Sequence, residues 1–103
     1  MADLNYLHSE KYIEKEFCKA IRQIGGKALK YYNHLDIGYP DRIVLLPHGR
    51  IVWAEMKSTG DKPTKVQLRR HAELRAMGFT VYVIDSIEGM HETVNQIGQH
   101  IKP

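Results

Sequence analysis

The chain has 103 residues, of which 43% are hydrophobic and 26% are charged. These values predict one globular domain over residues 1–103 with one modest core. The single cysteine, Cys18, excludes an intramolecular disulfide and a cysteine-based zinc cluster. A net charge of +3 favours a polyanionic partner. No apolar run approaches the roughly 20 residues that a bilayer requires, and no export signal is present, so we expect a cytoplasmic protein without membrane contact.

The first predicted element is a helix that begins at the capping residue Ser9 and extends to about Ile24. Gly25 and Gly26 follow it and are typical of a helix end. A short strand over 28–32 and a loop over 33–39 come next. The helix places its apolar residues on one stripe, at the spacing of a face turned to a core: Ile13, Phe17, Ala20, Ile21 and Ile24.

Two apolar runs, 42–46 and 50–54, predict a β-hairpin around the loop 47–49. Proline suits the first position of the turn and glycine suits a left-handed residue, which favours a three-residue loop. In that register Asp41 lies opposite Glu55. A two-residue loop closed by Pro47 and Arg50 would instead move Asp41 to the other face of the hairpin. We prefer the three-residue loop, partly because it also unites the acidic residues.

The second half of the chain predicts a helix, a strand and a helix. Thr64 caps a helix through about Met77, a strand covers 80–85, and Ser86 opens a last helix to about His100. A strand over 50–57, followed by this helix and the next strand, forms a βαβ unit with parallel strands. The expected fold is therefore α/β, with a mixed sheet flanked by helices in the order α-β-β-β-α-β-α.

Asp41 and the triplet Glu55-Met56-Lys57 are the strongest functional signal. The strand before Glu55 is apolar on both faces, and a doubly buried strand does not end in a carboxylate and an ammonium unless something charged meets them. Asp41 and Glu55 can share a divalent metal with Lys57 beside them, which suits phosphodiester hydrolysis. The alternative is that Asp41 caps a turn and Glu55 pairs with Lys57.

Further candidates come from both helices. Glu10 and Glu14 lie at the edge of the first helix's apolar stripe, where either could supply a third carboxylate or merely be solvated. Gln67 and His71 face inward on the second helix. Gln67 is a candidate active-site residue or a satisfied core amide, and His71 is interpreted as structural. A basic cluster that could hold phosphates, or simply form a solvated face, comprises Lys62, Lys65, Arg69 and Arg70.

Together these residues resemble a known family. The similarity runs from about Glu10 to Asp85, and the chain resembles the virus-type replication-repair nuclease family, VRR-NUC, of the PD-(D/E)XK nuclease superfamily. The motif that carries the resemblance comprises Gly38, Pro40-Asp41-Arg42, Gly49-Arg50, Glu55-x-Lys57, Gln67, Leu74, Gly78 and the strand Val81-Tyr-Val-Ile84.

The resemblance implies a restriction-endonuclease-like core that hydrolyses DNA with Mg²⁺, or Mn²⁺ as a substitute. Asp41, Glu55 and the Met56 carbonyl would bind the metal, and Lys57 would orient or deprotonate the attacking water. Gln67 would contact the site. Glu14 stands eleven residues before Gly25, which resembles the spacing in archaeal Holliday-junction resolvases, and is the expected third carboxylate. Glu10 is the alternative.

Stand-alone members of the family resemble dimeric junction resolvases, so branched DNA, such as a Holliday junction, and a two-fold homodimer are the expected partners. The aromatic residues Tyr31, Tyr32, Tyr39 and Trp53 offer apolar surface for a dimer. Three alternatives remain: a flap or general nuclease or nickase, a DNA-binding module on a nuclease fold, and a phosphodiesterase for RNA or nucleotides.

Overall fold

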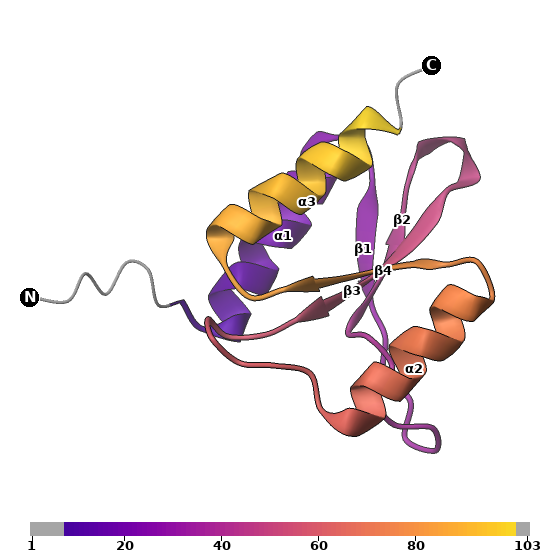
Figure 1. Cartoon of the computed structure of the whole chain (residues 1–103). Coiled ribbons are helices and arrows are strands. Elements are labelled where there is room, and N and C mark those ends of the chain that lie inside the picture. Colours follow the sequence, from indigo (N-terminus) through magenta and orange to yellow (C-terminus); the bar gives the residue numbers. More distant parts are fainter. Residues whose placement is uncertain (1–7, 101–103) are drawn as a thin grey trace, which may run out of the picture.

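A computed structural model describes residues 8–100 as a sheet with helices on both faces (Figure 1). The predicted order of helices and strands is confirmed, and a short 3₁₀ turn, η2, is added in the hairpin loop. Ser9, Thr64 and Ser86 cap the helices as predicted, since each side chain accepts a main-chain N–H of the first turn. The elements are α1 (Glu10–Gln23), β1 (Lys27–Lys30), β2 (Arg42–Leu45), η2 (Pro47–Gly49), β3 (Ile51–Met56), α2 (Lys65–Ala76), β4 (Thr80–Ile84) and α3 (Ile87–Gln99).

The four strands form one mixed sheet in the order β1-β2-β3-β4. The pairs β1–β2 and β2–β3 are antiparallel, and β3–β4 is parallel. This confirms both the hairpin and the βαβ unit. Strand β1 is displaced from the predicted 28–32 and begins at Lys27. No helix within residues 8–100 has the length and apolar character to cross a membrane.

The hairpin register is the one that brings the two acidic residues together. Arg42 pairs with Ala54, and the N–H of Leu46 donates to the carbonyl of Arg50 at 2.9 Å, so the loop has three residues as predicted. Continuing the same register places Asp41 beside Glu55. The loop conformation differs in one respect, because His48 as well as Gly49 has a positive φ, 66° and 74°.

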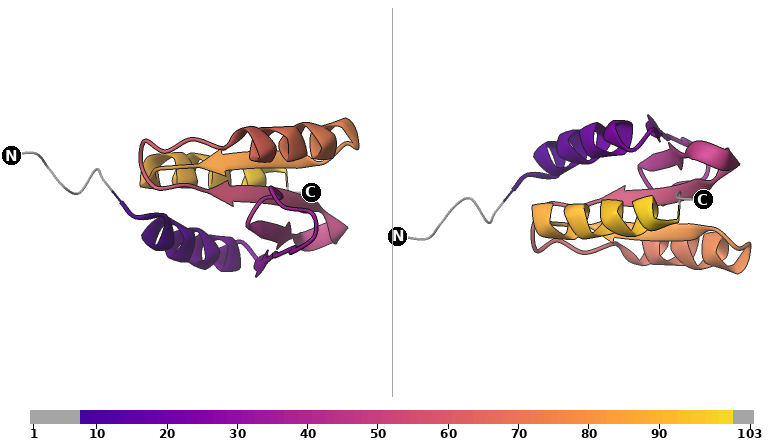
Figure 2. Two further views of the ribbon diagram at one scale, coloured as in Figure 1. Left: turned by 90° about the horizontal axis from the view of Figure 1, so that it is seen from below. Right: turned by 90° about the horizontal axis from the view of Figure 1, so that it is seen from above.

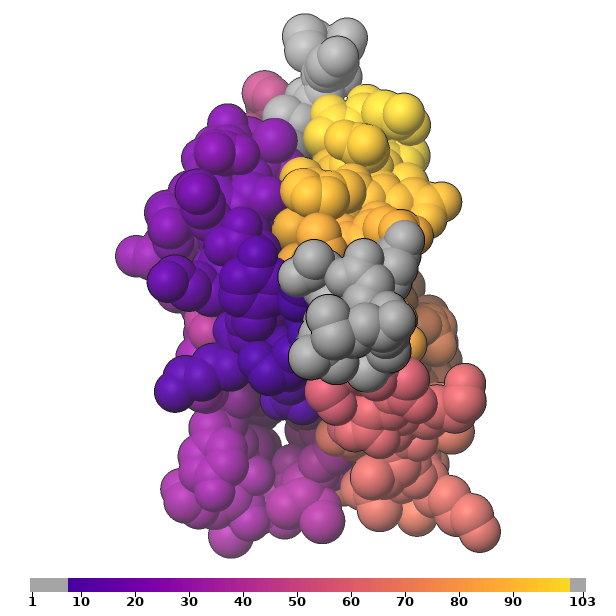
Figure 3. Space-filling view, turned by 90° about the vertical axis from the view of Figure 1, so that its left-hand side faces the viewer, coloured from indigo at the N-terminus to yellow at the C-terminus, as the bar shows by residue number. Residues whose placement is uncertain are grey.

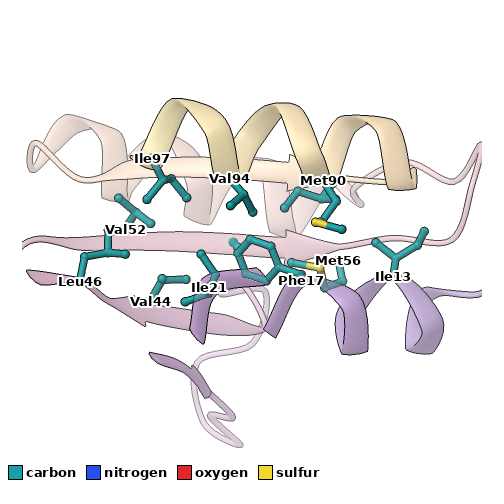
Figure 4. Packing of buried hydrophobic residues seen from close by; sticks show 12 residues of the cluster. Ile13, Phe17, Ile21, Val44, Leu46, Val52, Met56, Met90, Val94 and Ile97 are labelled. Atoms are coloured by element: carbon teal, nitrogen blue, oxygen red, sulfur yellow. The ribbon is translucent and has the colours of Figure 1, made fainter. Parts of the chain in front are cut away.

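The main core lies on the face of the sheet that α1 and α3 cover. Side chains alternate along β3, so Val52, Ala54 and Met56 enter this core. Figure 4 shows Val52 and Met56 together with the buried side chains that α1 and α3 contribute. The helical contributions come from one stripe of each helix: Ile13, Phe17, Ile21, Met90, Val94 and Ile97.

The opposite face of the sheet carries α2 and the odd-numbered residues of β3. Helix α2 packs against β4 through His71 and Leu74, both buried. Figure 2 shows α2 and α1 on different sides of the strands. Three apolar side chains on this face, from β1, β2 and the start of β3, are 38–42% exposed: Leu29, Leu45 and Ile51. Leu45 pairs with Ile51, whereas Leu29 pairs with Ile43.

The loop between β1 and β2 docks on α2 through Gly38. Its φ is +96°, and a Cβ at this position would lie 2.5 Å from Val66 Cγ1 and 3.1 Å from the Val66 carbonyl oxygen. The carbonyl of Ile37 also accepts a hydrogen bond from Arg70 Nε at 2.9 Å. These contacts fix the loop that leads directly into Asp41.

Gly38→Ala is therefore expected to destabilise the protein by about 2 kcal/mol, because it combines left-handed backbone strain with a clash against α2. Urea unfolding measures the loss. Gly60 is a matched control, since it also has a positive φ, +87°, but its Cβ would meet nothing within 4 Å. Equal losses for the two alanine variants would show that the contact with α2 contributes nothing.

Candidate active site

The site lies where β2 begins and β3 ends. Asp41 precedes β2, and its Oδ2 accepts the N–H of Met56 at 2.9 Å. Its carbonyl oxygen accepts the N–H of Tyr31 at 2.8 Å, which anchors the residue from its other side. In a strand the N–H and C=O of one residue point the same way, so the Met56 carbonyl also faces the Asp41 side.

Glu55 is buried, with 1% of its surface exposed, and two side chains of α2 contact its carboxylate. Gln67 Nε2 donates to Glu55 Oε2 at 3.4 Å, and His71 Nε2 lies 3.2 Å from Glu55 Oε1. Gln67 Oε1 simultaneously accepts the N–H of Thr64 in a capping box. The box fixes the amide orientation and leaves its N–H groups for Glu55.

Burial is the main cause that raises the pKa of Glu55 to about 8, and the neighbouring Asp41 carboxyl adds to it, whereas Lys57 opposes it. Two carboxyls this close cannot both ionise easily without a cation. Burial also lowers the pKa of His71. A neutral His71 with its proton on Nε2 donates to Glu55 and leaves the partnerless, buried Nδ1 unprotonated, which is the less costly tautomer.

Lys57 is buried beside the carboxylates, with 8% of its surface exposed. Its main-chain N–H donates to the carbonyl of Ile84 at 2.8 Å, so the last residues of β3 remain attached to β4. Its charge lowers the pKa values of Glu55, Glu10 and His71, which places the ammonium among these groups. A buried cation next to two carboxyls is the arrangement that the triplet predicted.

The structure separates Glu14 from Asp41 and Glu55. Glu14 Oε2 accepts a hydrogen bond from Arg42 Nε at 3.0 Å, and both side chains are 17% exposed. Arg42 follows Asp41 directly, so its side chain leaves β2 on the opposite face, toward α1. Glu14 is held there by an ion pair, on the other side of the sheet from Glu55.

Glu10, one turn earlier, lies closer to the site. Desolvation raises the pKa of Glu10, the charge of Asp41 adds to the increase, and Lys57 counteracts it. The start of α1 is attached to the loop after β3, because His8 N–H donates to Thr59 Oγ1 and Thr59 N–H donates to the His8 carbonyl, both at 3.2 Å. Of the two candidate glutamates, Glu10 is thus the one whose charge interacts with Asp41 and Lys57, whereas Glu14 is paired with Arg42.

The donor set fits a hard divalent cation. Within residues 8–100 no three acidic, histidine or cysteine side chains already converge tightly enough to hold a metal ion. Mg²⁺ does not require such a cage, since it commonly uses one or two carboxylates and fills its shell with water and phosphate oxygens. Asp41, Glu55 and the Met56 carbonyl could hold it, with Glu10 within range of the same charges.

A cavity of about 190 Å³ leads to the site between the loop before β2 and α2. Asp41 and Gln67 line its inner end, and residues of the loop line the rest, including Tyr31 and Tyr39. Figure 3 shows a hollow between the magenta surface of this loop and the coral surface that precedes α2. Substrate atoms can therefore approach the carboxylates from solvent.

The predicted basic cluster divides into two parts. Lys62, Lys65 and Arg69 are exposed. Arg70 is held within the chain: it donates to the Ile37 carbonyl and to Glu73, and its guanidinium lies 5.1 Å from the centre of the Tyr39 ring. Arg70 fixes the loop that carries Asp41, and the other three residues present charge to solvent.

Sequence reasoning missed the contact of His71 with Glu55. The signal was present, because Gln67 and His71 are four residues apart and so share one helix face. A polar pair on the inward face of α2, after a strand ending in a buried Glu55, predicts that both reach that carboxylate. The spacing of Thr64 and Gln67 likewise predicts the capping box at the start of α2.

Comparisons with known proteins agree with this geometry. No family profile matches the chain. It is 48% identical over 77 residues to "Putative nuclease p44" of Acyrthosiphon pisum secondary endosymbiont phage 1, and this match covers 75% of the chain and 83% of the phage protein. A solved structure described as "VRR_NUC domain" superposes with a TM-score of 0.77 and 28% identity, covering 92% of this chain and all of that one. The chain therefore belongs to the VRR-NUC family of nucleases and has its restriction-endonuclease-like fold.

Proposed function

We propose that this protein is a Mg²⁺-dependent DNA endonuclease that cuts branched DNA, with Asp41, Glu55, Lys57 and Gln67 as its active-site residues. The observation that carries the proposal is a pair of adjacent carboxyls, one of them buried with its pKa raised to about 8, next to the buried Lys57. An empty site of this kind costs stability, which a cation binding both carboxylates recovers.

Each residue has a distinct task. Asp41, Glu55 and the Met56 carbonyl would hold Mg²⁺, which when bound polarises the scissile phosphate and acidifies water. Gln67 and His71 orient the Glu55 carboxylate from behind. Lys57 positions the attacking water and offsets the negative charge that develops on the phosphate. Lys62, Lys65 and Arg69 are exposed on α2 and the loop before it and would contact flanking phosphates.

The test is a comparison of cleavage on four substrates of equal length: a four-way junction, a flap, a linear duplex and a single strand, each with and without Mg²⁺. We expect Mg²⁺-dependent cuts near the branch point of the junction. Cleavage of the linear duplex as fast as the junction would overturn the preference for branched DNA but not the nuclease. Binding without any cleavage would favour a DNA-binding module.

Glu10→Gln is expected to raise the Mg²⁺ concentration needed for half-maximal cleavage by about 10-fold, because Glu10 shares the field of Asp41 and Lys57. Glu14→Gln is expected to leave this concentration unchanged and to cost stability, since it removes the carboxylate that Arg42 contacts. A Mg²⁺ titration and urea unfolding of both variants separate these effects. A raised Mg²⁺ requirement for Glu14→Gln and an unchanged one for Glu10→Gln would show that Glu14, and not Glu10, acts at the metal site.

A two-fold homodimer would supply two cuts placed symmetrically across a junction. The exposed apolar side chains of Leu29, Leu45 and Ile51 on one face of the sheet support this proposal, and Leu45 and Ile51 are directly paired on adjacent strands. We expect light scattering at micromolar concentration to give twice the 11.9 kDa mass of one chain. Leu45→Lys combined with Ile51→Lys should return a monomer, and a monomeric wild-type protein would contradict the dimer.

A further inference from the structure

We infer that a basic groove between α1 and β1 is a second binding site for the DNA backbone and holds a duplex arm that leaves the active site. The groove has a volume of about 710 Å³ and lies on the opposite side of the sheet from α2. Its lining includes four cations: Lys11, Lys15, Arg22 and Arg42. The inference rests on the proposed function for the identity of its ligand.

The charge of the groove is strongly unbalanced. The only carboxylate in its lining is Glu14, and Arg42 neutralises it with the ion pair at 3.0 Å. Lys11, Lys15 and Arg22 are exposed, and within residues 8–100 none of the three makes an ion pair. Three cations therefore face solvent along one groove without an internal counter-ion. The phosphates of a DNA backbone are anions that could bind them.

The spacing of these cations suits a nucleic-acid backbone better than a small anion. Lys11, Lys15, Cys18 and Arg22 follow i, i+4, i+7 and i+11, so they form one stripe along α1. Eleven residues of helix extend about 16 Å, which equals the axial rise of about five nucleotides of one strand. Charges distributed over that length match a repeating anion.

The groove extends to the first turn of α1, since Ser9 and Lys11 are among its lining residues. These two residues flank Glu10, whose charge interacts with those of Asp41 and Lys57. The exposed cations Lys62, Lys65 and Arg69 belong to α2 and the loop before it, on the other side of the sheet from α1. A backbone that follows α1 and one that follows α2 therefore diverge from the cut, as two arms of a branched substrate do.

Cys18 makes the groove directly observable, because it is the only cysteine in the chain and lines the groove. Alkylation of its thiol, counted by intact mass, is expected to slow in proportion to the fraction of protein bound when a long duplex is added without Mg²⁺. High salt should restore the rate. Protection that grows with protein concentration in the absence of DNA would show that a second copy covers the groove, and would overturn the proposal.

The companion experiment measures duplex affinity against salt concentration, again without Mg²⁺. Changing Lys11, Lys15 and Arg22 together to glutamine should reduce the slope of log K against log[salt] by about 3, since each phosphate contact contributes about 0.9. Lys19→Gln is the control: Lys19 is exposed on the same helix but does not line the groove, and its slope should equal that of the wild type. A triple variant with the wild-type slope overturns the groove.

These experiments test DNA binding in the groove independently of the proposed nuclease activity. Both experiments read binding without cleavage, so they remain decisive if no substrate is cut. In the cleavage assay the triple variant should lose rate on junctions with long arms and keep the wild-type rate on junctions whose arms are too short to reach along α1. Equal loss on both would show that the substitutions affect the active site and not a groove for an arm.

Discussion

Replacing Asp41 with alanine, or Glu55 with glutamine, is expected to reduce cleavage by about 10²–10³-fold or more at saturating Mg²⁺. Asp41 is half-buried and its carboxylate is aligned by the Met56 N–H, while Glu55 is oriented by Gln67 and His71. In the proposed site each would supply an oxygen ligand to the metal, and Glu14 could not replace either because it is paired with Arg42 across the sheet.

The measurement is single-turnover cleavage of a four-way junction at a series of Mg²⁺ concentrations. Glu92→Gln is the matched control, since Glu92 is exposed on α3 and remote from the site, and it should cleave as the wild type does. Wild-type rates for either Asp41→Ala or Glu55→Gln would remove these residues from the active site. Circular dichroism confirms that the variants are folded.

The order of elements was predictable because each signal is local. Ser9, Thr64 and Ser86 start helices by accepting N–H groups within their own first turn, so a few residues decide each boundary. The register of β2 on β3 was also local, because the three-residue loop sets it. The turn residues left a two-residue loop as the alternative, and the three-residue loop of the structure is what places Asp41 beside Glu55.

The choice between Glu10 and Glu14 depends on a tertiary fact that the pattern of α1 does not contain. The helical wheel places both at the edge of the apolar stripe, but it does not reveal which face of the sheet α1 covers. Once α1 lies on the face opposite Glu55, the middle of the helix cannot reach the site around the sheet, whereas its first turn can. Arg42, on the α1 face, then binds Glu14.

The role of the second helix was only half predictable for a similar reason. The periodicity of α2 correctly predicted that Gln67 and His71 face inward. A buried histidine, however, is equally compatible with a purely structural contact. Its distance of 3.2 Å from Glu55 depends on how α2 crosses the sheet. The same crossing brings Arg70 onto the loop of Tyr39, so one member of the expected phosphate-binding cluster is used to hold the site together.

Metal-free Glu55→Gln is expected to be more stable than the wild-type protein at pH 9, although we expect it to cleave DNA far more slowly. The folded pKa of Glu55 is about 8, against an ordinary value of 4.5. Folding therefore favours the protonated form: its contribution to stability is complete below about pH 4.5 and is lost as the pH rises through about 8. Glutamine cannot ionise, so the variant lacks this loss.

Each unit of pKa shift corresponds to about 1.4 kcal/mol, and we expect the relative gain of the variant between pH 5 and pH 9 to be about 2–3 kcal/mol. We expect a gain smaller than the pKa difference multiplied by about 1.4 kcal/mol, because the charges of Asp41 and Lys57 also act on the Glu55 carboxyl. Urea unfolding in EDTA at both pH values gives the difference, and Glu92→Gln again serves as the control. A difference between wild type and Glu55→Gln that does not change with pH would contradict a raised pKa.

Mg²⁺ should cancel this difference, because a divalent cation bound by both carboxylates would compensate the charges that destabilise the metal-free protein. A ligand at about 100 times its Kd stabilises the folded state by about 2.7 kcal/mol, which is comparable to the expected loss. Wild-type protein at pH 9 should therefore recover in Mg²⁺, while Glu55→Gln gains much less. Burial of Glu55 is thus expected to cost stability in the metal-free protein at high pH, and binding of Mg²⁺ is expected to recover that stability.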